Sequence, residues 1–270
     1  MTKLIPFTKM AGAGNDFVVV DNRSKKIKNR LPNTARRLCD RHRSVGADGL
    51  ILLERSKRAD IRMRIFNPDG SEAEMCGNGV RCAAKFASDH KITKARLSIE
   101  TLAGVIAADV TGDVVKARLM DPKDLRLNLL IDVKGRKEKL HFINTGVPHA
   151  VKWVNSVGPY DAAGLGREIR FHEYFAPKGT NVNFISALNG NAIDVRTYER
   201  GVEAETLACG TGSTAAALVA AALKGFKSPV KTRTAGGEIL KVYFSRTENG
   251  FSDVYLEGKV STHFEGRVAI

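Results

Sequence analysis

The sequence predicts a mixed α/β protein made of two pseudo-symmetric halves. Each half is expected to be a curved mixed β-sheet wrapped around one central helix, with an active site in the cleft between the halves. Three observations support this: short β-rich segments dominate, a Cys-Gly-x-Gly helix start occurs twice, and the same elements precede both copies. At 270 residues, two domains are the default because a single core is near its size limit.

The first half carries the first copy of this pattern. Residues 60–66 alternate polar and apolar side chains, which is typical of a half-buried strand, and Asn67-Pro-Asp-Gly70 is typical of a turn. A Glu-Ala-Glu triplet and Cys76-Gly-Asn-Gly79 follow, and we expect a helix to about Asp89. Arg81 and Lys85 lie four residues apart, so one side of this helix should face solvent or a polar seam.

The second half repeats the order. Residues 192–198 alternate as a strand, a turn and a second Glu-Ala-Glu triplet follow, and Cys209-Gly-Thr-Gly212 begins a helix to about Leu223. Residues 215–223 include no polar side chain, which indicates a helix buried on all sides. Aligned on the cysteines, the two copies match at six of twelve positions, which indicates duplication of a whole domain.

The remaining strands complete the two halves. We place the halves at residues 1–122 and 123–262, with a tail at about 263–270 that could return to the first half. Further strands are predicted at residues 17–20, 97–101, 105–110, 114–119, 150–154, 182–185, 238–244 and 254–256, bounded by Gly, Asp and Asn.

Composition narrows the range of partners. The formal net charge is +14, but the densest basic clusters, at residues 23–30 and 134–139, have the character of solvated loops without interleaved aromatics, so no nucleic-acid partner is expected. The longest apolar run has nine residues and the N-terminus lacks a signal-peptide pattern, so we expect a cytoplasmic protein with no membrane partner. The four cysteines have neither disulfide-scaffold nor metal-site spacing, and no metal is predicted.

The two Cys-Gly-x-Gly starts have the features of anion sites. The first turn of a helix leaves N–H groups unpaired, the helix dipole favours an anion there, and glycine lets a ligand approach the backbone. A cysteine at such a start is stabilised as the thiolate. Cysteines often only pack in the core, and this interpretation suits Cys39 and Cys82, whereas the duplication favours a functional role for Cys76 and Cys209.

Two sulfurs facing each other across a cleft would suit the inversion of a carbon centre. One thiolate removes a proton from one face of the carbon, and the opposite thiol delivers a proton to the other face. The helix N-termini would stabilise the charge that develops on an adjacent carboxylate.

Six motifs resemble those of the diaminopimelate epimerase family, in order and spacing along nearly the whole chain. The narrower resemblance depends on Gly-Asn-Asp-Phe together with Tyr-Glu-Arg-Gly, since the cysteine motifs alone indicate only the broader superfamily of cofactor-independent racemases and isomerases. The motifs are Met10-Ala-Gly-Ala-Gly-Asn-Asp-Phe17, Arg64-Ile-Phe-Asn-Pro-Asp-Gly70, Met75-Cys-Gly-Asn-Gly79, Gly146-Val-Pro-His149, Tyr198-Glu-Arg-Gly201 and Ala208-Cys-Gly-Thr-Gly212.

The resemblance implies an isomerase that interconverts LL- and meso-diaminopimelate, for lysine and cell-wall synthesis, with no pyridoxal phosphate, other cofactor or metal. It implies Cys76 and Cys209 as the acid/base pair, with His149 and Glu199 as the polar residues that pair with the thiols. The residues that it implies for substrate binding are Asn15, Asn67, Asn181, Glu199 and Arg200, together with a carboxylate cradle of Gly77, Asn78, Gly210 and Thr211.

Two departures from the family pattern leave substrate detail open. Val147 occupies a position where many members of the family carry Asn, and Gly49 occupies one where some members carry Gln. The alternatives are a racemase of another amino acid such as histidine, an isomerase of the same fold, or a non-catalytic basic binding protein. The expected partner is a small-molecule substrate, and the assembly we consider is a homodimer.

Overall fold

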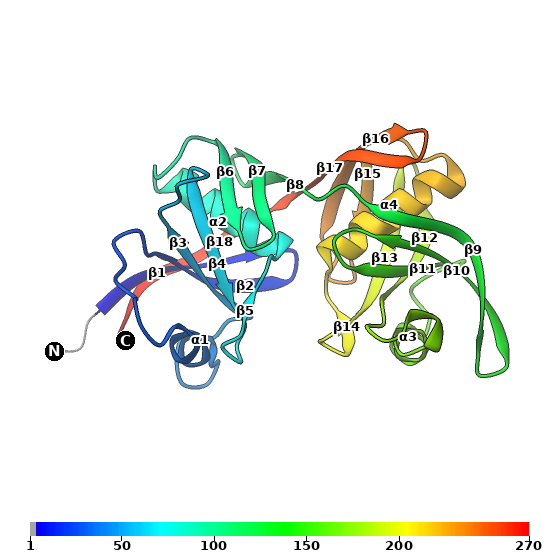
Figure 1. The fold of residues 1–270 in the computed structure, drawn as a ribbon, viewed down its shortest axis with the longest axis horizontal. Helices are drawn as coiled ribbons and strands as arrows, with labels where there is room; N and C mark the ends of the chain where they lie inside the picture. Colours follow the sequence, from blue (N-terminus) through cyan, green and yellow to red (C-terminus); the bar gives the residue numbers. More distant parts are fainter. Residues whose placement is uncertain (1–3, 270) are drawn as a thin grey trace. The chain divides into compact units, whose positions relative to one another are not determined.

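A computed structural model describes residues 4–269 (Figure 1). The chain divides into two compact units. Unit 1 runs to Arg118 and includes the chain again from Gly258, and unit 2 is Leu119–Glu257. Both units are rich in strands and contain two α-helices each among the described residues, so the predicted mixed α/β class is confirmed.

Unit 1 has helices on both faces of a mixed sheet. Strands β2 and β3 are parallel and joined through α1, and β4 and β6 are parallel and joined through α2, as parallel neighbours require a crossover. The elements are β1 (Leu4–Gly12), β2 (Asn15–Asp21), α1 (Leu31–Cys39), β3 (Gly49–Glu54), β4 (Ile61–Phe66), β5 (Glu72–Ala73), α2 (Gly77–Asp89), β6 (Arg96–Thr101), β7 (Gly104–Thr111), β8 (Val114–Arg118) and β18 (Ser261–Ala269).

The two-sided cover explains the sequence of β2. Phe17 and Val19 pack in the core that contains α2, while Val18 and Val20 pack in the core that contains α1. A strand buried on both faces has a continuous apolar run instead of an alternating one.

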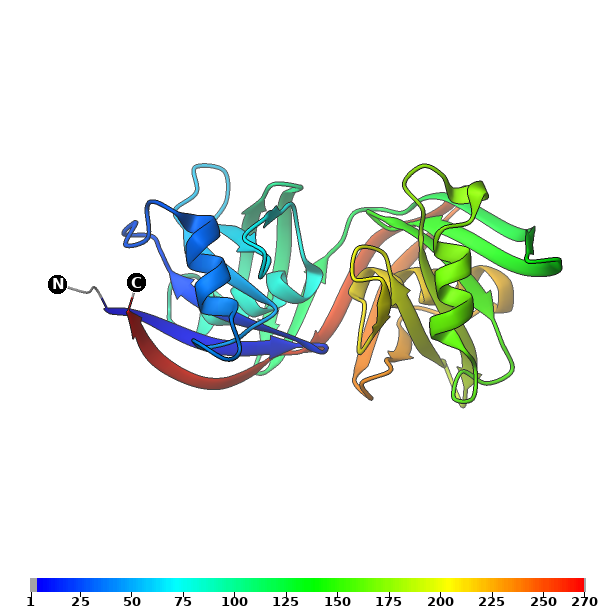
Figure 2. The ribbon, with the colours of Figure 1, turned by 90° about the horizontal axis from the view of Figure 1, so that it is seen from below.

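The last strand returns to the start of the chain. β18 pairs with β1 in antiparallel register from Leu4 opposite Ala269 to Ala11 opposite Ser261, and Figure 2 shows the two strands side by side. The end of the described chain therefore belongs to the sheet of unit 1.

Unit 2 repeats the pairing scheme of unit 1. Strands β11 and β12 are parallel and joined through α3, and β13 and β15 are parallel and joined through α4. The elements are β9 (Lys123–Val133), β10 (Arg136–Asn144), β11 (Pro148–Trp153), α3 (Ala162–Arg170), the 3₁₀ turn Glu173–Phe175, β12 (Asn181–Leu188), β13 (Ala192–Glu199), β14 (Ala204–Thr206), α4 (Gly210–Lys224), β15 (Val230–Arg233), β16 (Ile239–Thr247) and β17 (Gly250–Lys259).

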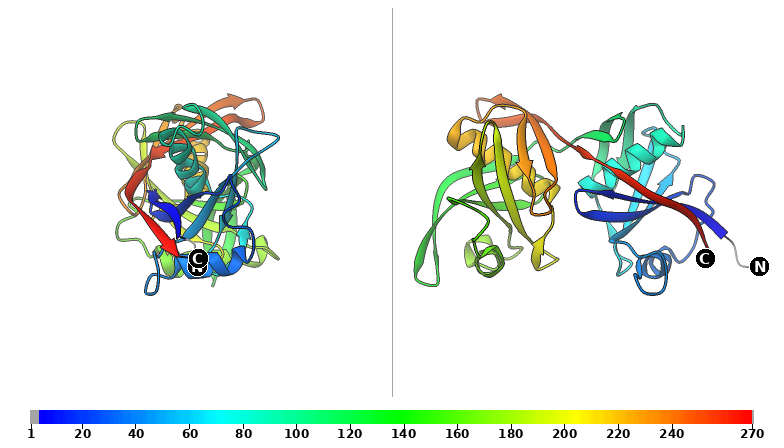
Figure 3. Two further views of the ribbon diagram at one scale, coloured as in Figure 1. Left: turned by 90° about the vertical axis from the view of Figure 1, so that its left-hand side faces the viewer. Right: turned by 180° about the vertical axis from the view of Figure 1, so that it is seen from behind.

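Helices α2 and α4 are the central helices of their units. Helix α2 contacts β1 to β4 and β6 to β8, and α4 contacts β10 to β13, β15 and β16. The right-hand view of Figure 3 shows each of these helices against the strands of its own unit. The stretch from Ala215 to Ala221 is wholly buried, which confirms the predicted apolar helix. In α2, Arg81 and Lys85 are buried in a polar seam, where Lys85 pairs with Asp89 and Asp113, so exposure to solvent is excluded.

The expected strands are all present, but two features were not predicted correctly. Residues 134–139 are not a loop: a turn at Lys134-Gly135 leads into β10, which forms a hairpin with β9. Helix α3 was not predicted, because its sequence carries two glycines and only a short apolar stripe. Within residues 4–269, none of the helices has the length and apolar character needed to span a bilayer.

Candidate functional site

In unit 1, Cys76 is the N-cap of α2. Its backbone is extended, and its Sγ accepts a hydrogen bond from the Gly79 N–H at 3.5 Å. A Cβ on Gly79 would lie 2.9 Å from Ile65 Cδ1, so this glycine lets the helix pack closely on β4. A Cβ on Gly77 would meet nothing within 4 Å, so the backbone of Gly77 is open to an approaching ligand.

Asn78 connects the start of α2 to the start of β2. Its Nδ2 donates to Asn15 Oδ1 at 2.7 Å, and its Oδ1 accepts from Arg81 Nη2 at 2.8 Å. The Arg81 side chain is fully buried, and its Nη1 also reaches the Gly77 carbonyl at 3.5 Å. Arg81 therefore fixes the side chain and backbone of this helix start, a role that the sequence did not indicate.

A network of charged side chains holds the Asn15 side chain in place. Asn15 Nδ2 donates to Asp48 at 3.1 Å, and Arg41 bridges Asp48 and Asp16 with distances of 2.7 Å. Burial alone would raise the pKa of Asp16, but hydrogen bonds from Arg41 and Lys9 outweigh it and hold that pKa well below its usual range. The Asp16 carboxylate, which Arg41 links to Asp48, therefore stays ionised.

Asn67 and Gly49 have clear structural roles in unit 1. Asn67 is exposed in the predicted turn, where its N–H donates to the Ser71 carbonyl at 2.8 Å and its Nδ2 to Ser71 Oγ at 2.9 Å. A Cβ on Gly49 would lie 3.1 Å from the Phe66 carbonyl oxygen and 3.2 Å from the Phe17 ring. Packing around Gly49 therefore accounts for the small residue at this departure from the family pattern.

In unit 2, Cys209 occupies the same place at α4 that Cys76 has at α2. It is the N-cap, and its Sγ accepts from the Gly212 N–H at 3.4 Å and lies 3.5 Å from Thr211 Oγ1. Burial raises the pKa of Glu199, and hydrogen bonds with Thr206 and Cys209 oppose this shift only in part. A carboxyl group that holds its proton more tightly than usual thus lies beside the Cys209 thiol.

His149 lies at the start of β11 and is fully buried. Burial, followed by the nearby charge of Arg200, lowers its pKa to about 3, so the ring is neutral at physiological pH. Its Nδ1 is 3.1 Å from Asn183 Nδ2, while its Nε2 has no hydrogen-bond partner among residues 4–269.

Asn181 ties three neighbouring strands of unit 2 together. Its Oδ1 accepts from the Arg200 N–H at 2.8 Å, and its Nδ2 donates to the Pro148 carbonyl at 3.0 Å. This fixes the backbone of Arg200, whose half-buried guanidinium reaches the Lys178 carbonyl at 3.5 Å.

The structure thus groups the sequence-predicted residues within each unit. Unit 1 brings Cys76, Gly77, Asn78 and Asn15 together, with Asn67 in a separate turn; unit 2 groups Cys209, Gly210, Thr211 and Glu199, and links His149, Asn181 and Arg200 around β11 to β13. Two further buried polar residues, Asn183 and Thr197, were not predicted. The available signal was Asn181-Val-Asn183, two amides on one face of a buried strand.

The other two cysteines have no such surroundings. Burial raises the pKa of Cys39 to about 11, and Cys82 is fully buried in the α2 core. Across the described chain there is no group of three or more His, Cys, Asp or Glu side chains that could hold a metal ion.

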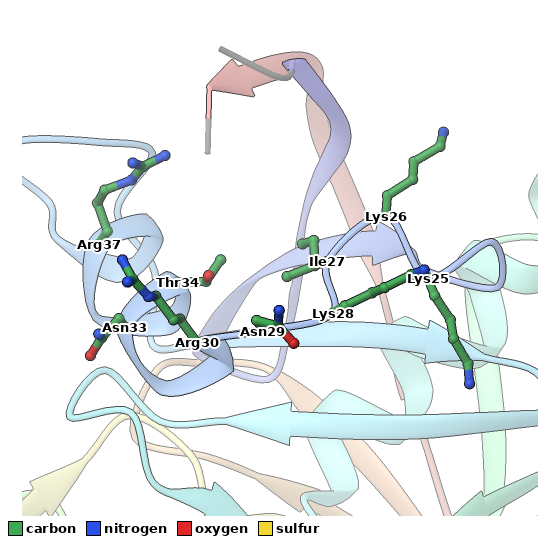
Figure 4. A pocket seen from close by; sticks show the side chains of 9 residues that line it. All are labelled: Lys25, Lys26, Ile27, Lys28, Asn29, Arg30, Asn33, Thr34 and Arg37. Carbon is green, nitrogen blue, oxygen red and sulfur yellow. The ribbon is translucent and has the colours of Figure 1, made fainter. Parts of the chain in front are cut away.

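A basic hollow lies before and along α1. Its lining includes Lys25, Lys26, Lys28, Arg30 and Arg37 but neither Asp nor Glu (Figure 4). The side chains of Lys25, Lys26 and Arg37 point in different directions, and the lysines are exposed, as expected of a solvated loop. These cations do not converge on one point.

Two comparisons of the sequence with known proteins indicate the same family. The family profile of diaminopimelate epimerase matches residues 7–122 and 141–262. The diaminopimelate epimerase of Aquifex aeolicus is 47% identical, with 97% of both chains covered.

Solved structures share the fold at low sequence identity. A Bacillus anthracis phenazine biosynthesis protein of the PhzF family has a TM-score of 0.78 at 17% identity and covers 99% of this chain and 100% of its own. A probable proline racemase from Agrobacterium radiobacter has a TM-score of 0.71 at 20% identity and covers 98% of this chain and 93% of its own. With the family profile and the close relative above, the chain belongs to the diaminopimelate epimerase family and is an isomerase.

Proposed function

We propose that the chain interconverts LL- and meso-2,6-diaminopimelate by a cofactor-independent, two-thiol mechanism that serves lysine and peptidoglycan precursor synthesis. The observation that carries this proposal is the equivalence of Cys76 and Cys209. Each is the N-cap of the central helix of its unit, and each Sγ accepts a hydrogen bond from the N–H three residues later. A thiol in this position is favoured as the thiolate.

In the proposed reaction, the substrate lies in a cleft between the two halves with one sulfur on each side of its α-carbon. One thiolate takes the α-proton, and the C–H electron pair remains on the substrate. The opposite thiol then gives its proton to the other face, where this electron pair forms the new C–H bond. The two sulfurs thereby exchange protonation states, and proton exchange with solvent restores the starting form.

The helix starts would stabilise the charge of the carbanion. In unit 1 the N–H groups of Gly77 and Asn78 lie in the first turn of α2, and in unit 2 those of Gly210 and Thr211 lie in the first turn of α4. Donors fixed before the reaction stabilise developing charge on the carboxylate without having to reorganise.

Two polar side chains would assist the sulfurs. We assign Glu199 to Cys209, because the two groups lie within hydrogen-bond reach and burial raises the pKa of the carboxyl group. The family resemblance implies that His149 also pairs with a thiol of the reaction.

The remaining site residues would hold the amino-acid end of the substrate that does not react. Asn15 and Asn67 would contribute from unit 1, and Asn181, Glu199 and Arg200 from unit 2. Arg200 suits a carboxylate, because a guanidinium can donate two parallel hydrogen bonds to it.

A substrate comparison tests this proposal. The purified protein is incubated separately with LL-diaminopimelate, L-histidine and L-proline under reducing conditions, and the stereoisomers are separated by chiral chromatography. We expect inversion of diaminopimelate alone, without added cofactor. Inversion of histidine or proline with diaminopimelate untouched would contradict the proposed substrate.

A further inference from the structure

A buried hydrogen-bond chain in unit 2 ends at His149. Strands β11 and β12 run parallel, with His149 opposite Asn181 and Val151 opposite Asn183. Asn183 is fully buried, and its Nδ2 lies 3.1 Å from His149 Nδ1. On the next strand, Thr197 is also buried and its Oγ1 lies 2.9 Å from Asn183 Oδ1.

The orientation of the Asn183 amide follows from its neighbours. Its Nδ2 is 3.1 Å from the Ala150 carbonyl oxygen, which can only accept a hydrogen bond, so the NH₂ end must face that carbonyl. The opposite end is then the oxygen, and the Thr197 hydroxyl donates to it. A flipped amide would place two carbonyl oxygens against each other in a buried site.

This orientation decides which His149 nitrogen carries the proton. The Asn183 NH₂ group has two hydrogens, one directed to the Ala150 carbonyl and the other to His149 Nδ1. Nδ1 must therefore accept, and in a neutral imidazole the proton is then on Nε2. Since burial keeps the ring neutral, Nε2 is a buried N–H donor that makes no hydrogen bond within residues 4–269 in this structure.

The same chain touches the helix start that carries Cys209. A Cβ on Gly212 would lie less than 3.0 Å from Asn183 Oδ1 and 3.1 Å from Thr197 Oγ1. The Gly212 N–H is also the donor to Cys209 Sγ, at 3.4 Å. The first turn of α4 therefore packs directly on the amide that orients His149.

We propose that Asn183 is a positioning residue that locks His149 as the Nε2–H tautomer, so that His149 stabilises a thiolate by donating a hydrogen bond and does not act as a general base. This inference rests on the proposed function, which pairs His149 with a thiol of the reaction. A ring that already carries its proton on Nε2 cannot take the proton of that thiol through the same nitrogen. The helix N-terminus then remains to favour the thiolate, and His149 Nε2–H strengthens that preference.

Nitrogen-15 NMR of histidine-labelled protein tests the tautomer without any turnover. The His149 signals are assigned by their loss in His149→Gln. In the wild type we expect His149 Nε2 protonated and Nδ1 unprotonated, with no change between pH 8 and pH 6. A protonated Nδ1, or a ring that titrates in this range, would overturn the proposal.

Asn183→Asp tests the positioning role. A carboxylate cannot donate a hydrogen bond to Nδ1, so the His149 ring should change to the Nδ1–H tautomer or become doubly protonated. We expect kcat to fall about 10²-fold or more with a smaller change in KM, since the wrong histidine tautomer in a serine protease triad lowers kcat by about 10⁴. An Asn183→Asp protein that keeps the Nε2–H tautomer would contradict the lock.

Asn22→Asp is the matched control. Asn22 is a fully buried asparagine of unit 1 whose Nδ2 donates to the Ile27 carbonyl and to Glu54, so its replacement also introduces a buried acid. It should lower stability without altering the His149 signals, and an altered His149 spectrum in this variant would contradict the specific role of Asn183. A wild-type Nε2–H signal in a protein that does not invert diaminopimelate would refute the proposed function while supporting the tautomer assignment.

Discussion

Two equivalent glycines should respond differently to the same substitution. Gly79 and Gly212 each lie three residues after a helix-capping cysteine, and each donates its N–H to the sulfur. A Cβ at Gly79 would lie 2.9 Å from Ile65 Cδ1, the flexible end of an apolar side chain. A Cβ at Gly212 would press on the oxygen of Asn183, which is fixed by its own hydrogen bonds.

The difference can be expressed as a free energy of unfolding. Replacing glycine by alanine inside a helix stabilises it by about 1 kcal/mol. At Gly79 this gain offsets an overpacking cost of about 1 kcal/mol, so the net change is near zero. At Gly212 the cost is about 1–3 kcal/mol for overpacking and about 1–3 kcal/mol for a buried hydrogen bond that is broken. After subtraction of the helix gain of about 1 kcal/mol, the net loss is about 1–5 kcal/mol, centred on about 3 kcal/mol.

Urea unfolding of Gly79→Ala, Gly212→Ala and the wild type measures this difference. Far-UV circular dichroism follows both variants, and the fluorescence of Trp153, the single tryptophan, reports on unit 2. We expect Gly212→Ala to lower the unfolding free energy by about 3 kcal/mol and Gly79→Ala to stay within about 1 kcal/mol of the wild type. If Gly212→Ala proves as stable as the wild type, the Asn183 amide is not the rigid contact inferred above.

Three further predictions concern pH, substrate binding and thiol reactivity. Burial, and then the nearby Lys charges, lower the pKa of His141 to about 4. Below about pH 6.5, His141 therefore becomes protonated in the unfolded chain while it stays neutral in the folded chain. The difference in unfolding free energy between wild type and His141→Gln should therefore have its full value above about pH 6.5. It should shrink by about 1 kcal/mol per pH unit as the pH falls from about 6.5 toward 4, and urea unfolding midpoints at about pH 7 and 5.5 would measure this change. Arg200→Gln should raise KM for diaminopimelate about 10- to 100-fold with a smaller change in kcat, because a charge-assisted hydrogen bond contributes about 1.5–3 kcal/mol; a KM near the wild-type value would exclude the carboxylate contact. Iodoacetamide at pH 7.5, read by peptide mass spectrometry, should modify Cys76 but spare Cys39 and Cys82, whose burial excludes the reagent, and early labelling of either would contradict their packing role.

The repeated elements were predictable because their signals are local. The strand over residues 60–66, the turn after it and the helix from Gly77 to Asp89 each follow from spacing within a few residues. The apolar run of α4 predicts burial on all sides, and the structure shows it from Ala215 to Ala221, while Ala222 and Leu223 are half-buried. The β9–β10 hairpin was harder to predict from the sequence, because many positions of its two strands are exposed charged residues.

The parts that were missed depend on contacts between distant residues. The spacing of Arg81 and Lys85 predicted solvent or a polar seam without deciding between them. Asn78 and the Gly77 carbonyl, together with Gly12 on the neighbouring strand, enclose Arg81. Asn183 gains its role only because β11, β13 and α4 meet around it. Residue spacing along one strand shows that a polar side chain is buried but does not identify its partners.

Isotope exchange during inversion tests the two-thiol mechanism most directly. LL-diaminopimelate is incubated in D₂O with the wild type, Cys76→Ser and Cys209→Ser, and deuterium at the α-carbon is measured in substrate and product at early times. We expect the meso product of the wild type to carry solvent deuterium while the remaining LL substrate stays unlabelled, and both variants to lose inversion. A product that retains the original hydrogen, or full inversion by either variant, would contradict the assignment of Cys76 and Cys209 as opposing acid and base.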